Sequence, residues 1–182
     1  MPLLLLLAAP ALFEYNSGAS LDVRTVSTDM RVNVQIRDIT FANASGGRTA
    51  AYLVSPEKPG HSAGVLFVHW YEPESKDSNR TQFLEQAVEL ASSGTVSLLI
   101  ATMWSQPDWF AKRTRSDDFA NSVKQVKELR RALDVLLATP GVDRRCIAYV
   151  GHDFGAMYGA VLAGVDRRVK AWALQSGNYL FQ

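Results

Sequence analysis

The sequence predicts an α/β fold, in which helices cover both faces of a mostly parallel sheet that begins with an antiparallel hairpin. Strand-like and helix-like segments alternate from about residue 30 onward, which is the order that builds parallel sheets through strand–helix–strand units. Two uninterrupted apolar runs, residues 63–68 and 96–101, are typical of central strands that helices cover on both sides. The 182 residues correspond to roughly one domain, and we assign residues 30–182 to it.

The hairpin comes first. Apolar and polar residues alternate from Val32 to Phe41, as in a half-buried strand. Residues 43–48 have the composition of a turn, and residues 50–54 form the returning strand, which Pro56 closes.

A helix follows the first buried strand. We expect Asn79 to cap this helix, with Gln82 three residues later as the reciprocal partner. Apolar residues then recur at helical spacing from Phe83 to Ala91, and Gly94 is placed to end the helix before the strand at residues 96–101.

The second half of the chain repeats this pattern. An aromatic-rich connection, residues 103–119, leads into a helix with an apolar stripe from Val123 to Leu137. The opposite face of this helix is expected to be polar, with Lys124, Lys127, Arg131 and Asp134. Two further strands, residues 146–150 and 169–174, flank a helix of small residues at 156–163, which gives six strands in total.

Residues 1–12 form an apolar run of a different kind. It is too short to span a bilayer, which takes about 20 residues. It resembles the apolar part of a secretory signal, with Ala9 and Ala11 framing a cleavage point, although no Lys or Arg precedes it. We therefore assign residues 1–20 to a leader and expect a secreted or periplasmic protein without a membrane span. The alternative is an apolar segment that packs on a cytoplasmic protein.

Composition and charge exclude several classes of partner. Lys and Arg total 19 against 18 Asp and Glu, so no positive field favours nucleic acid. A single cysteine, Cys146, excludes an internal disulfide and a Cys-based zinc site, and three scattered histidines suggest no metal site. The chain has neither G-x-G-x-x-G nor G-K-S/T, which disfavours a nucleotide-binding domain, and we expect no cofactor.

The candidate chemistry lies in Gly151-His152-Asp153-Phe154-Gly155, between a buried strand and a helix. This is the context of a nucleophile elbow, G-x-Nu-x-G, which holds its central residue in a strained turn above the sheet. The two glycines are needed because side chains there would keep strand and helix apart. The first amides of the helix would then face the reacting group as an oxyanion site.

At this motif the chain resembles the α/β-hydrolase superfamily, in particular dienelactone hydrolases, acetyl xylan esterases and prolyl-oligopeptidase-like hydrolases. The resemblance covers roughly residues 30–177 and rests on V-L-F-V-H-W and Y-V-G-H-D-F-G-A-M-Y-G-A. It implies a hydrolase acting on a small ester, lactone or similar small molecule. The family's oxyanion-hole amides would fall on Trp70 or Tyr71, after His69, and on Phe154.

Two departures from the family pattern are important. The family's esterases carry Ser at the centre of the elbow, where this chain has Asp153. The family also carries an acid and a histidine after its seventh and eighth strands; none of the three histidines fits, so we expect the C-terminal part of the fold to be missing. The last strand would then be an exposed edge through which the protein could self-associate.

Asp153 leaves three functions open. The first is hydrolysis of a small ester or lactone, as the resemblance implies. A carboxylate nevertheless disfavours ordinary serine-esterase chemistry, because attack on an ester would give an anhydride. It suits displacement at saturated carbon, as in haloalkane dehalogenases and epoxide hydrolases, whose G-H-D-x-G motif is similar, although their characteristic loop and the Trp after the nucleophile are absent. The third alternative is a catalytically inactive member or fragment in which Asp153 only caps the helix.

The other candidates have less specific roles. We expect His152 to pack beneath the elbow and His69 to hold its loop by hydrogen bonds. Trp104, Trp109 and Phe110 follow a strand end where open α/β sheets bind ligands, so they either line an apolar pocket or cover the core.

Overall fold

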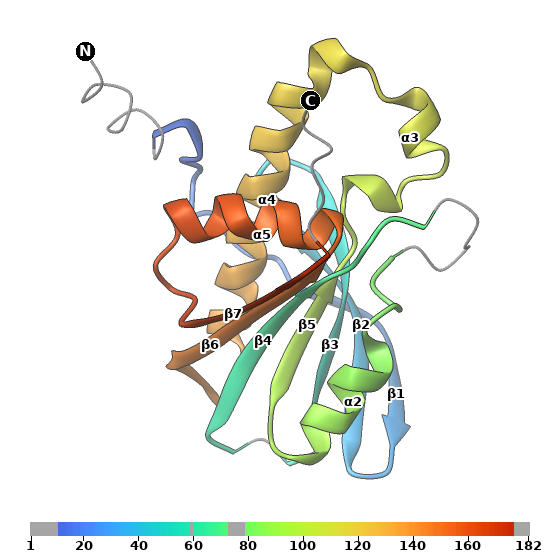
Figure 1. The fold of residues 1–182 in the computed structure, drawn as a ribbon. Helices are drawn as coiled ribbons and strands as arrows, with labels where there is room; N and C mark the ends of the chain where they lie inside the picture. Colours follow the sequence, from blue (N-terminus) through green and yellow to red (C-terminus); the bar gives the residue numbers. More distant parts are fainter. Residues whose placement is uncertain (1–10, 59, 73–78, 177–182) are drawn as a thin grey trace.

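A computed structural model describes residues 11–58, 60–72 and 79–176. The strands of these residues form one sheet in the order β1-β2-β3-β5-β4-β6-β7 (Figure 1). Its strands are β1 Arg24–Arg31, β2 Val34–Ala42, β3 Arg48–Pro56, β4 Ser62–Val68, β5 Val96–Ile100, β6 Val142–His152 and β7 Ala171–Gln175. The α-helices are α2 Leu84–Ser92, α3 Trp109–Lys112, α4 Asp118–Ala138 and α5 Phe154–Val165.

The sheet is antiparallel on one side and parallel on the other. β1, β2, β3 and β5 pair antiparallel in turn, whereas β5, β4, β6 and β7 are parallel neighbours. Short helical turns, Met103–Ser105 and Arg115–Asp117, flank α3 in the connection from β5 to α4. The predicted fold class, with an antiparallel hairpin (β2 and β3) before a parallel sheet, is confirmed.

Alternation along the strands divides the core between the two faces. α4 and α5 lie on one face of the sheet (Figure 1). The buried cluster on this face includes Ile39, Leu53 and Leu66. On the other face α2 covers the intervening side chains, among them Ile36 and Val54. Helices therefore lie on both faces, as the apolar runs indicated.

The sequence did not reveal β1. Seven of its eight residues are exposed, so it has no core-facing alternation to mark it as a strand. Val32, which we assigned to the next strand, instead lies with Asn33 in the turn between β1 and β2 and is 87% exposed. Asn33 has a φ of 59°, which a hairpin turn of this length favours.

The expected cap of α2 is wrong. The side chain of Asn79 accepts a hydrogen bond from the N–H of Thr81 and closes a turn, and the helix begins one turn later at Leu84. An Asn side chain can satisfy a turn as readily as a helix end, so the motif alone does not place the first residue. Gly94 ends the helix as predicted, with a φ of 93°.

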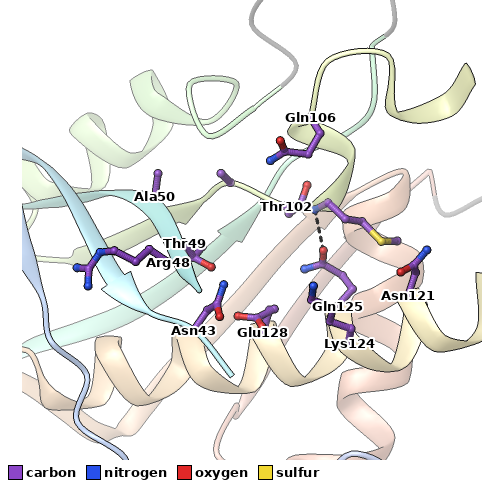
Figure 2. A pocket seen from close by; sticks show the side chains of 12 residues that line it. Asn43, Arg48, Thr49, Ala50, Thr102, Gln106, Asn121, Lys124, Gln125 and Glu128 are labelled. Carbon is purple, nitrogen blue, oxygen red and sulfur yellow. Dashed lines mark hydrogen bonds between the residues drawn. The ribbon is translucent and has the colours of Figure 1, made fainter. Parts of the chain in front are cut away.

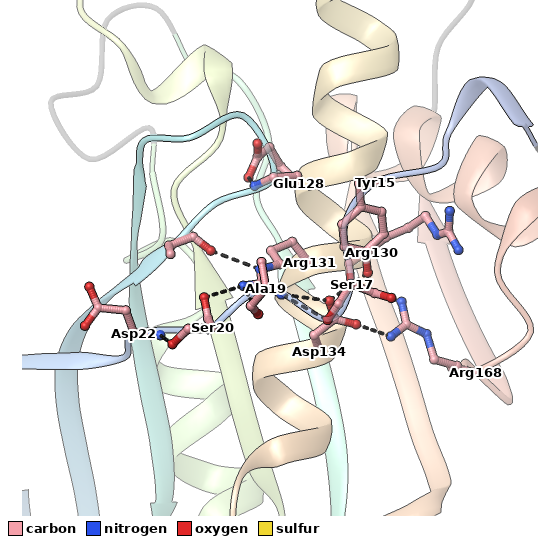
Figure 3. A network of polar contacts seen from close by, with 12 residues as sticks. Tyr15, Ser17, Ala19, Ser20, Asp22, Glu128, Arg130, Arg131, Asp134 and Arg168 are labelled. Atoms are coloured by element: carbon pink, nitrogen blue, oxygen red, sulfur yellow. Dashed lines mark hydrogen bonds and ion pairs between the residues drawn. The ribbon is translucent and has the colours of Figure 1, made fainter.

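Arg131 is also misplaced by the helical pattern, because it is 1% exposed rather than solvated. Its guanidinium donates to the carbonyl oxygens of Ala42, Ala19 and Ser20 at 2.7–3.0 Å (Figure 3). A buried cation is tolerated when hydrogen bonds satisfy its donors. Arg131 thus attaches the chain before β1 to α4.

Neighbouring contacts strengthen this attachment. The hydroxyl of Tyr15 donates to Asp134 at 2.7 Å, and Arg130 donates to the carbonyl of Phe13 at 2.7 Å. Asp134 also pairs with Arg168 (Figure 3). Residues 13–20, within the expected leader, therefore pack against α4, whereas residues 1–10 lie outside the described residues.

Two expectations concern surfaces. Among the described residues, no helix is long and apolar enough to cross a membrane. β7 pairs with β6 and forms one edge of the described sheet. Self-association through this edge stays a prediction.

Candidate functional site

The chain turns sharply at Asp153, between the end of β6 and the start of α5. Asp153 has φ 52° and ψ −114°, a conformation that a residue with a side chain rarely adopts and that costs about 1–3 kcal/mol. The expected elbow geometry is therefore present, with Asp153 at its centre.

The two glycines of the motif allow close contact between strand, turn and helix. A Cβ on Gly155 would lie 2.1 Å from the carbonyl oxygen of Val68 in β4, and one on Gly151 would lie 2.5 Å from the carbonyl oxygen of Gly155. The hydroxyl of the buried Tyr149 donates to that same Gly155 oxygen at 2.7 Å. Tyr149 was not identified from the sequence, where it is one more apolar residue of a buried strand.

The carboxylate of Asp153 faces the loop after β4. Its Oδ2 accepts a hydrogen bond from the backbone N–H of Tyr71 at 3.3 Å. Asp153 holds the N-cap position of α5, but its side chain makes no capping hydrogen bond to the helix. The backbone N–H of Asp153 donates to Gln175 at the end of β7, at 2.9 Å, which ties the turn to the neighbouring strand.

The predicted oxyanion-hole amides come from two elements that meet at this carboxylate. Of the two alternatives after β4, Tyr71 has the amide that contacts Asp153. The carbonyl of Trp70 is held by the ring of His69. Phe154 is the first residue of α5, where helix amides lack partners within the helix. Backbone N–H groups of a loop and of a helix N-terminus are the kinds of donor that can stabilise an anion.

His69 is a buried, neutral anchor of the loop and not a base beside Asp153. Its Nδ1 lies 2.8 Å from the carbonyl of Trp70, and its Nε2 lies 2.9–3.0 Å from the hydroxyls of Ser105 and Thr102. These contacts fit a tautomer that donates from Nδ1 and accepts at Nε2. The indole N–H of Trp104, 3.2 Å from Nδ1, then donates to the backbone carbonyl of His69 at 3.3 Å. Burial lowers the pKa of His69 to about 4, outweighing the raising effect of the Trp70 carbonyl.

Thr102 and Ser105 were not predicted as site residues. They form a capping box at the end of β5, with the Ser105 hydroxyl accepting from the N–H of Thr102 at 2.9 Å. The T-x-x-S spacing is a weak version of the sequence signal for such a box. Through His69 they connect the end of β5 with the loop that carries Tyr71.

His152 is half-buried beside the elbow. Its ring packs edge-on against Trp70, with centroids 5.2 Å apart. Its Nδ1 is buried and has no hydrogen-bond partner among the described residues. Among the residues that the structure describes, no histidine forms a hydrogen bond with the Asp153 side chain.

The predicted aromatic residues divide into core and surface. Trp104 is 1% exposed and stacks on Tyr158, so it belongs to the core. Phe110 is 51% exposed and stacks on Tyr71, with centroids 5.8 Å apart. Trp109 packs edge-on against Tyr71 and Phe154 and lines a hollow of only about 10 Å³. Trp109 and Phe110 thus pack around the ring of Tyr71, the residue whose backbone N–H contacts the carboxylate.

A metal site needs several ligating side chains close together. Within the residues that the structure describes, no three His, Cys, Asp or Glu side chains are grouped so that they could hold a metal ion.

Comparison with solved structures shows that the fold of the chain is α/β-hydrolase-like. No family model matches the chain, and no curated protein matches it in sequence. It is similar in structure to an acetyl xylan esterase from Paenibacillus sp. R4, with a TM-score of 0.68 and 20% identity over 95% of this chain and 58% of that one. Acetyl xylan esterase 1 from Thermoanaerobacterium sp. JW/SL YS485 gives a TM-score of 0.71 at 11% identity, covering 92% of this chain and 57% of that one.

A third similar structure, methylesterase BT1017, has a TM-score of 0.68 at 18% identity and covers 93% of this chain but 38% of its own length. The chain therefore spans less than two thirds of the length of these structures. It has an α/β-hydrolase-like fold.

Proposed function

We propose that the chain is a hydrolase acting on a small ester, lactone or similar substrate, with Asp153 at the nucleophile position. The observation that carries this proposal is the strained turn that sets the Asp153 carboxylate against the amide of Tyr71. Support comes also from the similar structures, which include two acetyl xylan esterases and a methylesterase. Because fold alone does not define function, the site residues are the part to be tested.

The proposed reaction begins with a competition for the Tyr71 amide. A substrate carbonyl oxygen that binds there displaces the carboxylate oxygen, which frees Asp153 to attack the acyl carbon. The attack forms a mixed anhydride, which makes this route less favourable than ordinary serine-esterase chemistry, and expels an alkoxide, which takes a proton from water and leaves as the alcohol. The resulting hydroxide cleaves the anhydride, which releases the acid and restores the carboxylate. The amides of Tyr71 and Phe154 would stabilise the oxyanion in both steps.

The presence of Asp rather than Ser supports a second candidate, displacement at saturated carbon. Asp153 would then expel a halide or open an epoxide, forming an alkyl ester that water hydrolyses. A third candidate is a catalytically inactive protein, in which Asp153 occupies the Tyr71 amide permanently.

Hydrolysis of p-nitrophenyl acetate, dihydrocoumarin, 1-bromobutane and styrene oxide by the 182-residue protein separates these candidates. We expect activity on the ester or the lactone that Asp153→Ala abolishes. Asp108→Ala is a matched control, because Asp108 also has a positive φ, 57°, but its side chain is exposed at a surface turn. Turnover on the halide or the epoxide alone would favour the second candidate. Equal rates for Asp153→Ala and the parent would reject Asp153, and no activity on any substrate would favour the inactive protein.

A single turnover in ¹⁸O-labelled water tests covalent participation of Asp153. Hydrolysis of an anhydride or alkyl ester by attack at the Asp153 carbonyl leaves the label in that side chain, which mass spectrometry of the peptide around Asp153 detects. For the halide or the epoxide, turnover without label in this peptide would contradict the nucleophile role. For the ester or the lactone, the released acid is analysed as well, because water attack at the substrate carbonyl of the anhydride places the label there.

We also propose that the protein is exported and processed after Ala11. Cleavage there would leave residues 13–20 in their contacts with α4. The mass of the protein recovered from the periplasm or the medium tests this. An intact Met1 on a protein found only in the cytoplasm would contradict it.

A further inference from the structure

An open pocket of about 390 Å³ lies beside α4 (Figure 2). The start of β3, the residues after β5 and the first half of α4 form its walls. Neither Asp153, Tyr71 nor Phe154 lines it. Its volume falls within the range of about 300–1,000 Å³ that is typical of small-molecule sites.

Two of its polar side chains are fixed by the turn between β2 and β3. The Oδ1 of Asn43 accepts from the N–H groups of Ser45 and Gly47 at 3.1 and 2.7 Å, so the Nδ2 group of Asn43 remains as a donor. The carboxylate of Glu128 accepts from the hydroxyl of Ser45 at 2.9 Å and from the N–H of Ala44 at 3.3 Å. These bonds hold a donor and an acceptor in place before any ligand arrives, which lowers the entropy lost on binding.

Gln125 adds a donor without a partner. It is 3% exposed, and its Oε1 accepts from the N–H of Met103 at 2.9 Å (Figure 2). Since a backbone N–H can only donate, this bond fixes which side of the amide carries the NH₂ group. That Nε2 group is buried and has no hydrogen-bond partner among the described residues. An oxygen of a ligand seated against Gln125 would supply the missing acceptor.

The charges around the pocket disfavour an anion. The guanidinium of Arg48 is already bound to Asp22 and Thr40. Lys124, exposed at the rim, is the remaining cation of the lining, and it lies near the carboxylate of Glu128. A ligand that needs both donors and acceptors but carries no charge fits this set better than a phosphate or a carboxylate.

We propose that this pocket binds a neutral polyhydroxylated molecule of about monosaccharide size, through Asn43, Gln125 and Glu128. Hydroxyl groups donate and accept, so each can satisfy an amide NH₂ group and the carboxylate in turn. The side chains of Ala50, Ala101 and Met103 in the lining provide apolar surface for the C–H face of such a ring. The proposal does not depend on the hydrolase function, because none of the residues proposed for that reaction takes part.

Titration of the ¹⁵N-labelled protein with D-glucose and D-xylose, followed by ¹H–¹⁵N spectra, tests this proposal. We expect shifts in residues 43–50 and 121–128, and most directly in the side-chain NH₂ signal of Gln125. Gln125→Leu should raise the dissociation constant about tenfold, the equivalent of one buried hydrogen bond. Lys127→Met, two residues further along α4 and outside the lining, is the matched control and should leave the constant unchanged.

Inorganic phosphate and acetate serve as competing probes. If they shift the Gln125 signal and the sugars do not, the site is anionic and the proposal is wrong; Glu128→Gln should then strengthen phosphate binding. Absence of any shift with either sugar also overturns the proposal. If Gln125→Leu fails to fold, Asn121→Leu at the exposed rim replaces it and should weaken sugar binding in the same direction.

Discussion

The carboxylate of Asp153 lies against the backbone N–H of Tyr71, with 3.3 Å between Oδ2 and the amide nitrogen. This contact joins the end of β6 to the loop after β4, two strands that are neighbours in the sheet. It also means that the side chain at the nucleophile position occupies a predicted oxyanion-hole donor. Under the proposed function, a substrate would have to displace it, and the strength of this contact would then affect the rate.

The close approach of α5 to β4 predicts a large penalty for Gly155→Ala. Its new Cβ would lie 2.1 Å from the carbonyl oxygen of Val68, so helix and strand must separate. We expect a loss of about 3 kcal/mol in the free energy of unfolding, measured by urea denaturation. Gly164→Ala, in the same helix with open space around it, should instead stabilise by up to about 1 kcal/mol. Equal effects at the two positions would show that the approach is not tight.

The positive φ of Asp153 predicts that glycine is more stabilising than alanine at this position, the reverse of their order within a helix. Both Asp153→Gly and Asp153→Ala remove the carboxylate, so their difference isolates the positive φ. We expect the glycine variant to be more stable by about 1 kcal/mol. In the middle of α4, the Lys127→Ala variant should be more stable than the Lys127→Gly variant by about 1 kcal/mol, which is the usual order within a helix. A more stable alanine variant at position 153 would contradict the strain.

Burial of His69 predicts a loss of stability in mild acid. Its pKa is about 4 in the folded protein, against an ordinary value of 6.5. The unfolded chain therefore binds more protons between these values, and stability falls as the pH drops from about 6.5 to about 4. Protonation of His69 accounts for at most about 3 kcal/mol of the free energy of unfolding that is lost in this pH range.

Urea denaturation at several pH values checks this prediction. His69→Gln should flatten the dependence in that window, whereas His61→Gln, at an exposed position, should leave it as in the parent. An unchanged slope in His69→Gln would show that another group is responsible.

Arg131 predicts a link between α4 and the chain before β1. Arg131→Met leaves the carbonyls of Ala19, Ser20 and Ala42 without their donor. We expect a loss of about 3–5 kcal/mol and faster proteolytic cleavage within residues 12–23. The same substitution at Arg167, an exposed residue after α5, is the control. Cleavage at the parental rate in Arg131→Met would contradict the attachment.

Local signals in the amino-acid chain are enough to indicate several elements of the fold. The alternation in β2, the apolar runs of β4 and β5 and the glycine spacing of the elbow each reflect a constraint within a few residues, so the fold class and the sharp turn at Asp153 could be predicted. Only the tertiary structure placed the Asp153 carboxylate on Tyr71, buried Arg131 under carbonyls more than 80 residues away and brought Asn43 to the same pocket as Gln125. It also revealed β1, which has no buried face of its own. These features depend on which distant groups meet, and hydrogen bonds between distant segments leave no periodicity in the chain that makes them.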